Sequence, residues 1–178
     1  MNQQQSIETS EHLKSAVYGA NDGIVTTFAV VAGVAGAQLS SSVVLILGIA
    51  NMVADGISMG LSNYLGERSQ RRFLNNHKHN LIFHTAVWHN GLITFIAFNL
   101  AGVLPLSPYL LSLFGLPIPN PFLCSILSTA LALFLVGSLR TLLTRDSWYK
   151  NGLEMLLVGA LAATAAYLSG FLINTLIN

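Results

Sequence analysis

Five long apolar stretches constrain the fold of this chain more than any other feature. Of its 178 residues, 53% are hydrophobic and only 8% are charged, whereas about a quarter of the residues in a soluble domain are charged. An apolar stretch of about 20 residues can cross a bilayer as an α-helix. We therefore expect an all-α membrane protein with one transmembrane domain, 1–178, and a short cytoplasmic loop at 67–85. Its predicted helices are 15–37, 41–66, 86–106, 121–143 and 152–177.

The positions of the basic residues support five spans. All eight lie before the first helix, after the second, or around the junction of the fourth and fifth: Lys14, Arg68, Arg71, Arg72, Lys78, Arg140, Arg145 and Lys150. With five spans, these three places lie on the same side of the membrane. The positive-inside rule then predicts a cytoplasmic N-terminus and an external C-terminus. The formal net charge of +1 gives no reason to expect nucleic-acid binding.

Two aspartates, Asp22 and Asp55, interrupt the first and second apolar stretches. An ionisable group inside a membrane helix costs about 3 kcal/mol, so it is by default a functional-site hypothesis. Asp55, Met59 and Asn63 follow one another at intervals of four residues, which places a carboxylate, a thioether and an amide oxygen along one helix face. Hard and soft donors together indicate a transition-metal ion.

The helix rise predicts that these donors lie at similar depths. Asp22 and Met59 are each about 12 Å from the cytoplasmic end of their helix, and Asp55 is about 18 Å from it. A carboxylate at such a depth can take up a proton when the ion leaves, so we expect proton exchange to accompany metal movement. Two neighbouring serines would add oxygens or have a structural role: Ser58 and Ser62.

Each candidate also has a structural interpretation. Asp22 could cap or unwind its helix within Asn-Asp-Gly, and Met59 alone is more often a packing residue than a ligand. Glu154, close to Lys150, is as easily an interfacial ion pair as a part of the ion path. Cys124 lies in an apolar helix and is expected to be a buried core residue.

Four histidines near the cytoplasmic loop match no closed metal site, so we expect an interfacial loop there: His77, His79, His84 and His89.

Four segments resemble the vacuolar iron transporter (VIT) family of divalent-metal transporters. They are GANDGIVTTFAVVAGVAGA at 19–37, ISMGLSNYLGERSQ at 57–70, GVLPLSPYLL at 102–111 and NGLEMLLVGALAATAAYLSG at 151–170. The resemblance implies a homodimer of five-helix protomers with the ion path at the subunit interface, exchanging cytosolic Fe²⁺ or Mn²⁺ for protons. The metal is then a substrate, and no cofactor is implied. The resemblance assigns Asp22 and Met59 to the ion path.

The chain departs from the family pattern in two places. The usual cytoplasmic metal-binding domain between the second and third helices is missing, because only 67–85 stands there. The family's carboxylate after the methionine is replaced by Asn63, whereas Asp55 occupies a position at which the family usually has a small residue. We hypothesise that Asp55 compensates for the lost carboxylate.

The leading function is therefore transport of Fe²⁺ or Mn²⁺ out of the cytoplasm, which is not an enzymatic activity. A bacterial inner membrane suits this short chain, although a vacuolar membrane would obey the same charge rule. One alternative is a membrane metal sensor or scaffold that does not transport. A remote alternative is an intramembrane aspartyl protease, but the aspartates occur as Asn-Asp-Gly and Ala-Asp-Gly rather than in a GxGD-type motif.

Overall fold

The computed structural model describes residues 3–76, 87–144 and 146–178, and these residues are almost entirely helical. Five helices within them are long and apolar enough to cross a membrane, which confirms the predicted fold class. A short sixth helix, α5, connects two of them. In chain order the helices are α1 (Gln3–Gly36), α2 (Ser41–Asn76), α3 (Trp88–Leu113), α4 (Pro121–Leu139), α5 (Thr141–Thr144) and α6 (Trp148–Ile177).

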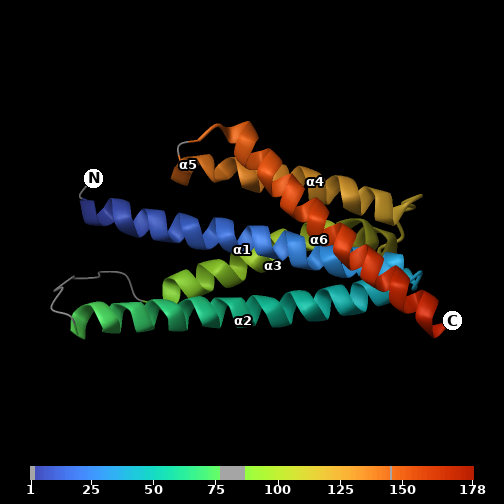
Figure 1. The fold of residues 1–178 in the computed structure, drawn as a ribbon, viewed down its shortest axis with the longest axis horizontal. Helices are drawn as coiled ribbons and strands as arrows, with labels where there is room; N and C mark the ends of the chain where they lie inside the picture. The colour runs from blue at the N-terminus through green and yellow to red at the C-terminus, as the bar shows by residue number, and fades with distance from the viewer. Residues whose placement is uncertain (1–2, 77–86, 145) are drawn as a thin grey trace.

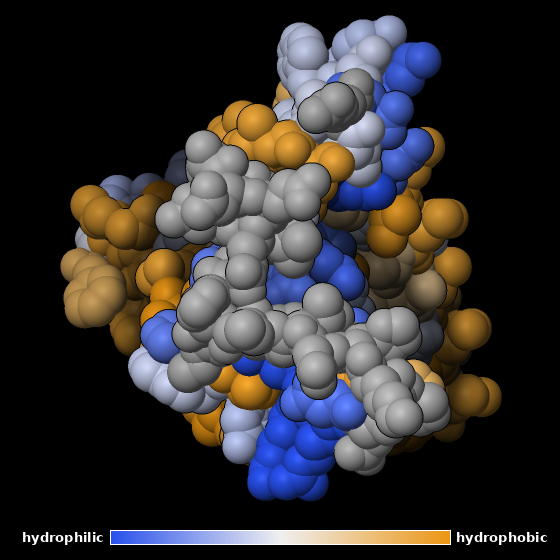
Figure 2. Space-filling model, turned by 90° about the vertical axis from the view of Figure 1, so that its left-hand side faces the viewer, coloured by the Kyte–Doolittle hydropathy of each residue, from blue (hydrophilic) through white to orange (hydrophobic). Residues whose placement is uncertain are grey.

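The helices form an elongated bundle whose termini lie at opposite ends (Figure 1). The start of α1, the end of α2, the start of α3 and the α4–α6 junction share the N-terminal end of the molecule. Six basic residues of the described ranges belong to these segments: Lys14, Arg68, Arg71, Arg72, Arg140 and Lys150. Hydrophilic side chains gather at this end, and hydrophobic side chains form the flanks behind it (Figure 2).

Glycines bring α1 into close contact with α3. A Cβ at Gly19 would lie 2.6 Å from the carbonyl oxygen of Thr94, and a Cβ at Gly23 would meet the backbone of Phe98. Small residues permit such a contact in lipid, where packing rather than hydrophobicity drives helix association. The small residues of α1 thus serve a contact within this chain.

Helix α3 continues through Pro105 and Pro108 to Leu113, whereas the helix predicted from the sequence ends at residue 106. A proline inside a helix removes a backbone donor and leaves the carbonyl four residues earlier without its usual partner. For Pro108 that carbonyl belongs to Leu104, and it accepts hydrogen bonds from the Ser107 and Ser128 hydroxyls at 2.7 and 3.2 Å. Hydroxyl groups thus supply the missing donors, which allows the helix to continue.

The helices also extend beyond the apolar stretches at the N-terminal end of the molecule. Helix α1 begins at Gln3 rather than at residue 15, and α2 ends at Asn76 rather than at residue 66. Residues 67–76 of the predicted loop are consequently helical. Hydropathy marks only the part of a helix that crosses the hydrocarbon, so it underestimates helices that project from the membrane.

Two apolar clusters fill the bundle. One joins α1, α3, α4 and α6, and contains Ile24, Ala101, Ala132, Leu133 and Met155. The other, which we term the distal cluster, joins α1, α2 and α3 at the end away from the N-terminus. It contains Phe28, Val31, Val34, Val44, Leu106 and Tyr109.

The contact between α1 and α3 predicts a difference between two Gly→Ala substitutions. Gly23→Ala should destabilise the protein by about 1–3 kcal/mol, because the new methyl group meets backbone that cannot move freely. Gly66→Ala is a matched control, since a Cβ there meets nothing within 4 Å. Unfolding of the purified proteins in detergent would compare them. Equal stabilities for the two variants would contradict the assigned contact.

Candidate functional site: a polar groove between α1 and α2

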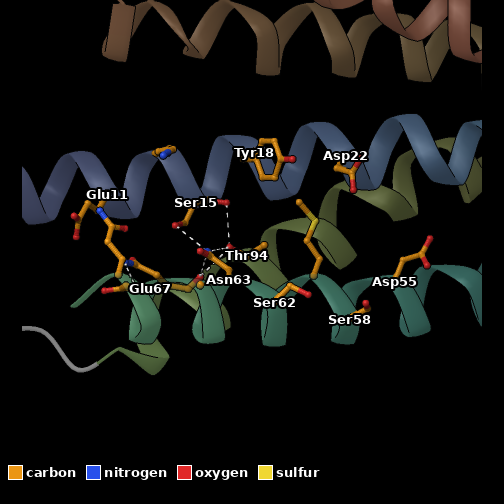
Figure 3. Close-up of a pocket in the computed structure, with 15 residues that line it drawn as sticks. Glu11, Ser15, Tyr18, Asp22, Asp55, Ser58, Ser62, Asn63, Glu67 and Thr94 are labelled. Carbon is orange, nitrogen blue, oxygen red and sulfur yellow. Dashed lines mark hydrogen bonds between the residues drawn. The ribbon is translucent and has the colours of Figure 1, made fainter. Parts of the chain in front are cut away.

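A groove of about 660 Å³ runs between α1 and α2, with α3 forming part of its wall. Figure 3 shows its polar side chains arranged along the facing sides of α1 and α2. Its lining contains six of the seven candidate site residues, including both membrane aspartates. The lining residues are Glu11, Lys14, Ser15, Tyr18, Asp22, Asp55, Ser58, Met59, Ser62, Asn63, Gly66, Glu67, Gln70, Asn90 and Thr94.

The two aspartates reach the groove from different helices. Asp22 lies on α1 opposite Ser58, and Asp55 lies on α2 farther from the N-terminal end (Figure 3). Asn51, one turn before Asp55, donates a hydrogen bond from Nδ2 to Asp55 Oδ2 at 2.7 Å. This bond orients the Asp55 carboxylate and uses one of its two oxygens. The groove therefore brings two anionic groups together inside the membrane-spanning region.

Met59 and the two serines add neutral donors between these carboxylates and the N-terminal end. Met59 is partly buried, whereas Ser58 and Ser62 are exposed. All three line the groove. A divalent ion in it would meet carboxylate and hydroxyl oxygens that replace water ligands, together with a thioether that favours softer ions.

The side chain of Asn63 connects three helices. Its Nδ2 donates to Ser15 Oγ on α1 at 3.2 Å, and to the Asn90 carbonyl oxygen and Thr94 Oγ1 on α3 at 3.2 and 2.6 Å. We name this set of bonds the Asn63 tie. The predicted oxygen ligand is therefore attached through its nitrogen end to both neighbouring helices.

A second polar network lies one turn nearer the N-terminal end. Asn90 is 5% exposed, and its Nδ2 donates to Glu67 Oε2 on α2 at 2.8 Å. Its Oδ1 lies 2.5 Å from Nδ1 of His12 on α1, and Glu67 also forms an ion pair with Arg71. These groups satisfy one another across three helices, so their polarity is compatible with burial.

Sequence reasoning missed several groove residues. Glu67 continues the four-residue spacing of Asp55, Met59 and Asn63, but ending the second helix at residue 66 placed it in a loop. Asn90 and Thr94 are also four residues apart, on one face of α3. Polar residues at helical spacing within an apolar stretch were the signal that could have identified them.

Other predicted candidates lie elsewhere. Glu154 is outside the groove lining, and its carboxylate approaches Arg140, rather than Lys150, at 3.5 Å. His89 stacks on Trp88, with ring centroids 4.1 Å apart. Cys124 is partly buried. The remaining loop histidines lie outside the described residues: His77, His79 and His84.

The charged side chains of the groove do not form a compact metal site. Within residues 3–76, 87–144 and 146–178, no group of three or more His, Cys, Asp or Glu side chains is placed to hold a metal ion. The groove instead combines four carboxylates spread along its length, Glu11, Asp22, Asp55 and Glu67, with one lysine, neutral oxygens and one sulfur. Carboxylate and neutral oxygens are the ligands that divalent ions commonly use.

Most of the chain matches a known protein family. The model of the VIT family matches residues 13–82 and 76–171. The chain belongs to the VIT family. Its groove residues from Ser15 to Thr94 all lie within the matched segments.

Individual relatives show both short, strong matches and long, weaker ones. A vacuolar iron transporter of Toxoplasma gondii is 46% identical over 70 residues, which cover 39% of this chain and 23% of that protein. The vacuolar iron transporter of Plasmodium falciparum is 26% identical, over 94% of this chain and 84% of that protein. Vacuolar iron transporter 1 of Arabidopsis thaliana is 25% identical, over 88% of this chain and 84% of that protein.

These matches indicate where the relatives have additional residues. The alignment with the Plasmodium falciparum protein spans 230 positions, more than the 178 residues of this chain, so the relative contains an insertion. The family-model match divides in two at residues 76–82. This division falls in the short segment, 67–85, that connects the second and third apolar stretches of the sequence.

The Asn90 network predicts that Asn90→Leu will destabilise the bundle. Leucine has a similar volume, but it leaves Glu67 and His12 without their shared partner, which should cost about 1–3 kcal/mol. Asn99→Leu is the matched control, because the hydrogen bond of the Asn99 amide among the described residues lies within its own helix, to the Phe95 carbonyl at 2.9 Å. Free energies of unfolding in detergent should therefore fall further for Asn90→Leu. An equal loss would indicate that the network adds little stability.

Proposed function

We propose that this chain transports a divalent transition metal, Fe²⁺ or Mn²⁺, out of the cytoplasm. The observation that carries the proposal is that Asp22, Asp55 and Met59 line one groove inside the membrane-spanning part of the bundle. Membership of the VIT family supports the same substrate class, since its relatives are named vacuolar iron transporters. In this proposal the metal enters from the end that carries the basic residues and reaches the aspartates along the groove.

Proton exchange would couple metal transport to a proton gradient across the membrane. When a divalent ion leaves, two facing carboxylates repel each other in a low-dielectric environment, and protonation relieves that repulsion. Asp22 and Asp55 are suited to this role because their helices face each other across the groove. Protons entering from the opposite side would then release metal there, which is antiport.

A homodimer would complete the site. Helix α2 carries small residues at intervals of four on its exposed surface: Ala50, Ala54, Ser58, Ser62 and Gly66. Small residues at this spacing permit close contact between membrane helices. Since Ser58 and Ser62 also line the groove, a partner packed there would add its own carboxylates to the ion path. The membrane would be a bacterial inner membrane, with the N-terminus in the cytoplasm.

Transport by proteoliposomes tests the function. Under an imposed pH gradient, the native chain should move Fe²⁺ and Mn²⁺, and Asp22→Asn should reduce that flux by at least about tenfold because a membrane carboxylate is lost. Asp55→Asn should have a similar effect. Glu154→Gln is the matched control, because Glu154 lies outside the groove.

Different results would lead to different conclusions. Metal binding without flux would indicate a sensor or scaffold. Normal transport by Asp55→Asn, with none by Asp22→Asn, would show that Asp55 does not compensate for the carboxylate absent at Asn63. Gradient-independent flux would exclude antiport.

Cysteine cross-linking tests the dimer. In a Cys124→Ala background, Ala54→Cys should form a disulfide-linked dimer in membranes, because the proposed contact brings two copies of α2 together. Leu157→Cys is the control, since Leu157 is 66% exposed on α6, away from the proposed contact. Cross-linking at Leu157 but not at Ala54 would place the interface on another face.

A further inference from the structure

The Asn63 tie has a defined orientation. The Asn90 carbonyl oxygen can only accept a hydrogen bond, so the group of Asn63 that faces it must be the amide nitrogen. The Thr94 hydroxyl donates to the Asn90 carbonyl at 2.9 Å, so its lone pairs can accept from Asn63 Nδ2. An aspartate at position 63, when ionised, would have no donor for either contact.

The tie fixes the part of α2 that carries Met59. Gly60, the next residue, meets Gly91 of α3, and a Cβ at Gly91 would lie 2.6 Å from the Gly60 carbonyl oxygen. Asn63 lies on the same turn of α2 as Gly60. It forms hydrogen bonds to Asn90, next to Gly91 on α3, and to Ser15 on α1. The backbone contact and the tie together determine how far Met59 stands from α1, where Asp22 lies.

Burial makes the tie a strong constraint. Thr94 is 1% exposed and Ser15 is 8% exposed, so water does not compete effectively for these bonds. An unpaired amide or hydroxyl at this place would remain desolvated, which is costly in a low-dielectric interior. Helix α2 is therefore held at one distance from α1 and α3.

We propose that Asn63 is a positioning residue, which acts through its amide nitrogen to hold Met59 in line with Asp22, rather than a ligand that acts through its oxygen. The inference rests on the proposed metal transport and adds a division of roles within it. The two aspartates supply charge, Met59 supplies preference for soft ions, and the Asn63 tie sets their separation. The tie thereby contributes to ion selectivity without contacting the ion.

The sharpest test compares Asn63→Asp with Ser62→Asp. Both add a carboxylate to the groove at adjacent positions, but only Asn63→Asp removes the amide donor. Binding of Cd²⁺ and Mn²⁺ to the purified full chain in detergent is the readout. We expect Asn63→Asp to bind Cd²⁺ about tenfold more weakly, with the Cd²⁺/Mn²⁺ preference falling toward that of Met59→Leu. Ser62→Asp keeps the tie and adds a carboxylate, so it should bind Cd²⁺ at least as tightly as the native chain does.

Substitution of the acceptor provides a second line of evidence. Thr94→Val removes the hydroxyl that Asn63 contacts at 2.6 Å, and should lower the Cd²⁺/Mn²⁺ preference as Asn63→Asp does. Thr94→Ser keeps the hydroxyl and should retain the native preference. If Asn63→Asp binds metal as tightly as the native chain, or more tightly, and Thr94→Val has no effect, Asn63 is an oxygen ligand and the proposal is wrong.

A distance measurement separates this proposal from the proposed function. Spin labels on Ser10→Cys and Arg72→Cys, in a Cys124→Ser background, would report the separation of α1 and α2, since both positions are exposed. The distance distribution should broaden in Asn63→Asp and Thr94→Val, but not in Ser62→Asp or Thr94→Ser. A native chain that binds no metal would refute the transport proposal, whereas unchanged distances in Asn63→Asp would refute the positioning role.

Discussion

The close approach of the α1 and α3 backbones at Gly19 and Gly23 determines where the groove can lie. Helix α2 is held on α3 in a similar way through Gly60 and Gly91. With both helices fixed on the same neighbour, α1 and α2 contact each other less than either contacts α3. The space left between them is the groove. Its position is therefore a result of backbone packing, because larger residues at these glycines would separate the helices from α3.

Polar groups in the groove divide into two sets with different physical roles. Asn63, Asn90 and Glu67 form hydrogen bonds across helices, and these bonds satisfy groups that hydrocarbon would otherwise leave unpaired. Ser58 and Ser62, in contrast, are exposed along the groove. Polarity inside a membrane protein is thus evidence for either architecture or binding. The contacts of each side chain are what separate the two.

The sequence predicted the class of fold because hydropathy and helix rise act locally. Five spans, and a shared level for Asp22 and Met59, followed from spacing alone, and both residues do line one groove. The predicted end of α3, at residue 106, was wrong because the hydroxyl of Ser128, on another helix, supports the turn around Pro108. The role of Asn63 was equally inaccessible. Spacing showed which face of α2 it occupies, but only the position of α3 reveals that Thr94 and the Asn90 carbonyl accept from its nitrogen.

The distal cluster lies farther along α1 and α2 than the two aspartates of the groove. Its members Phe28 and Val31 follow Asp22 along α1, and Val44 precedes Asp55 on α2 by eleven residues, or about 16 Å of helix. An unpaired ion within such an apolar region would face a cost of tens of kcal/mol in the idealised limit. In the proposed transport, the cluster would therefore act as a barrier to charge. A charged groove could then enter the bilayer from one side without dissipating the voltage and ion gradients across the membrane.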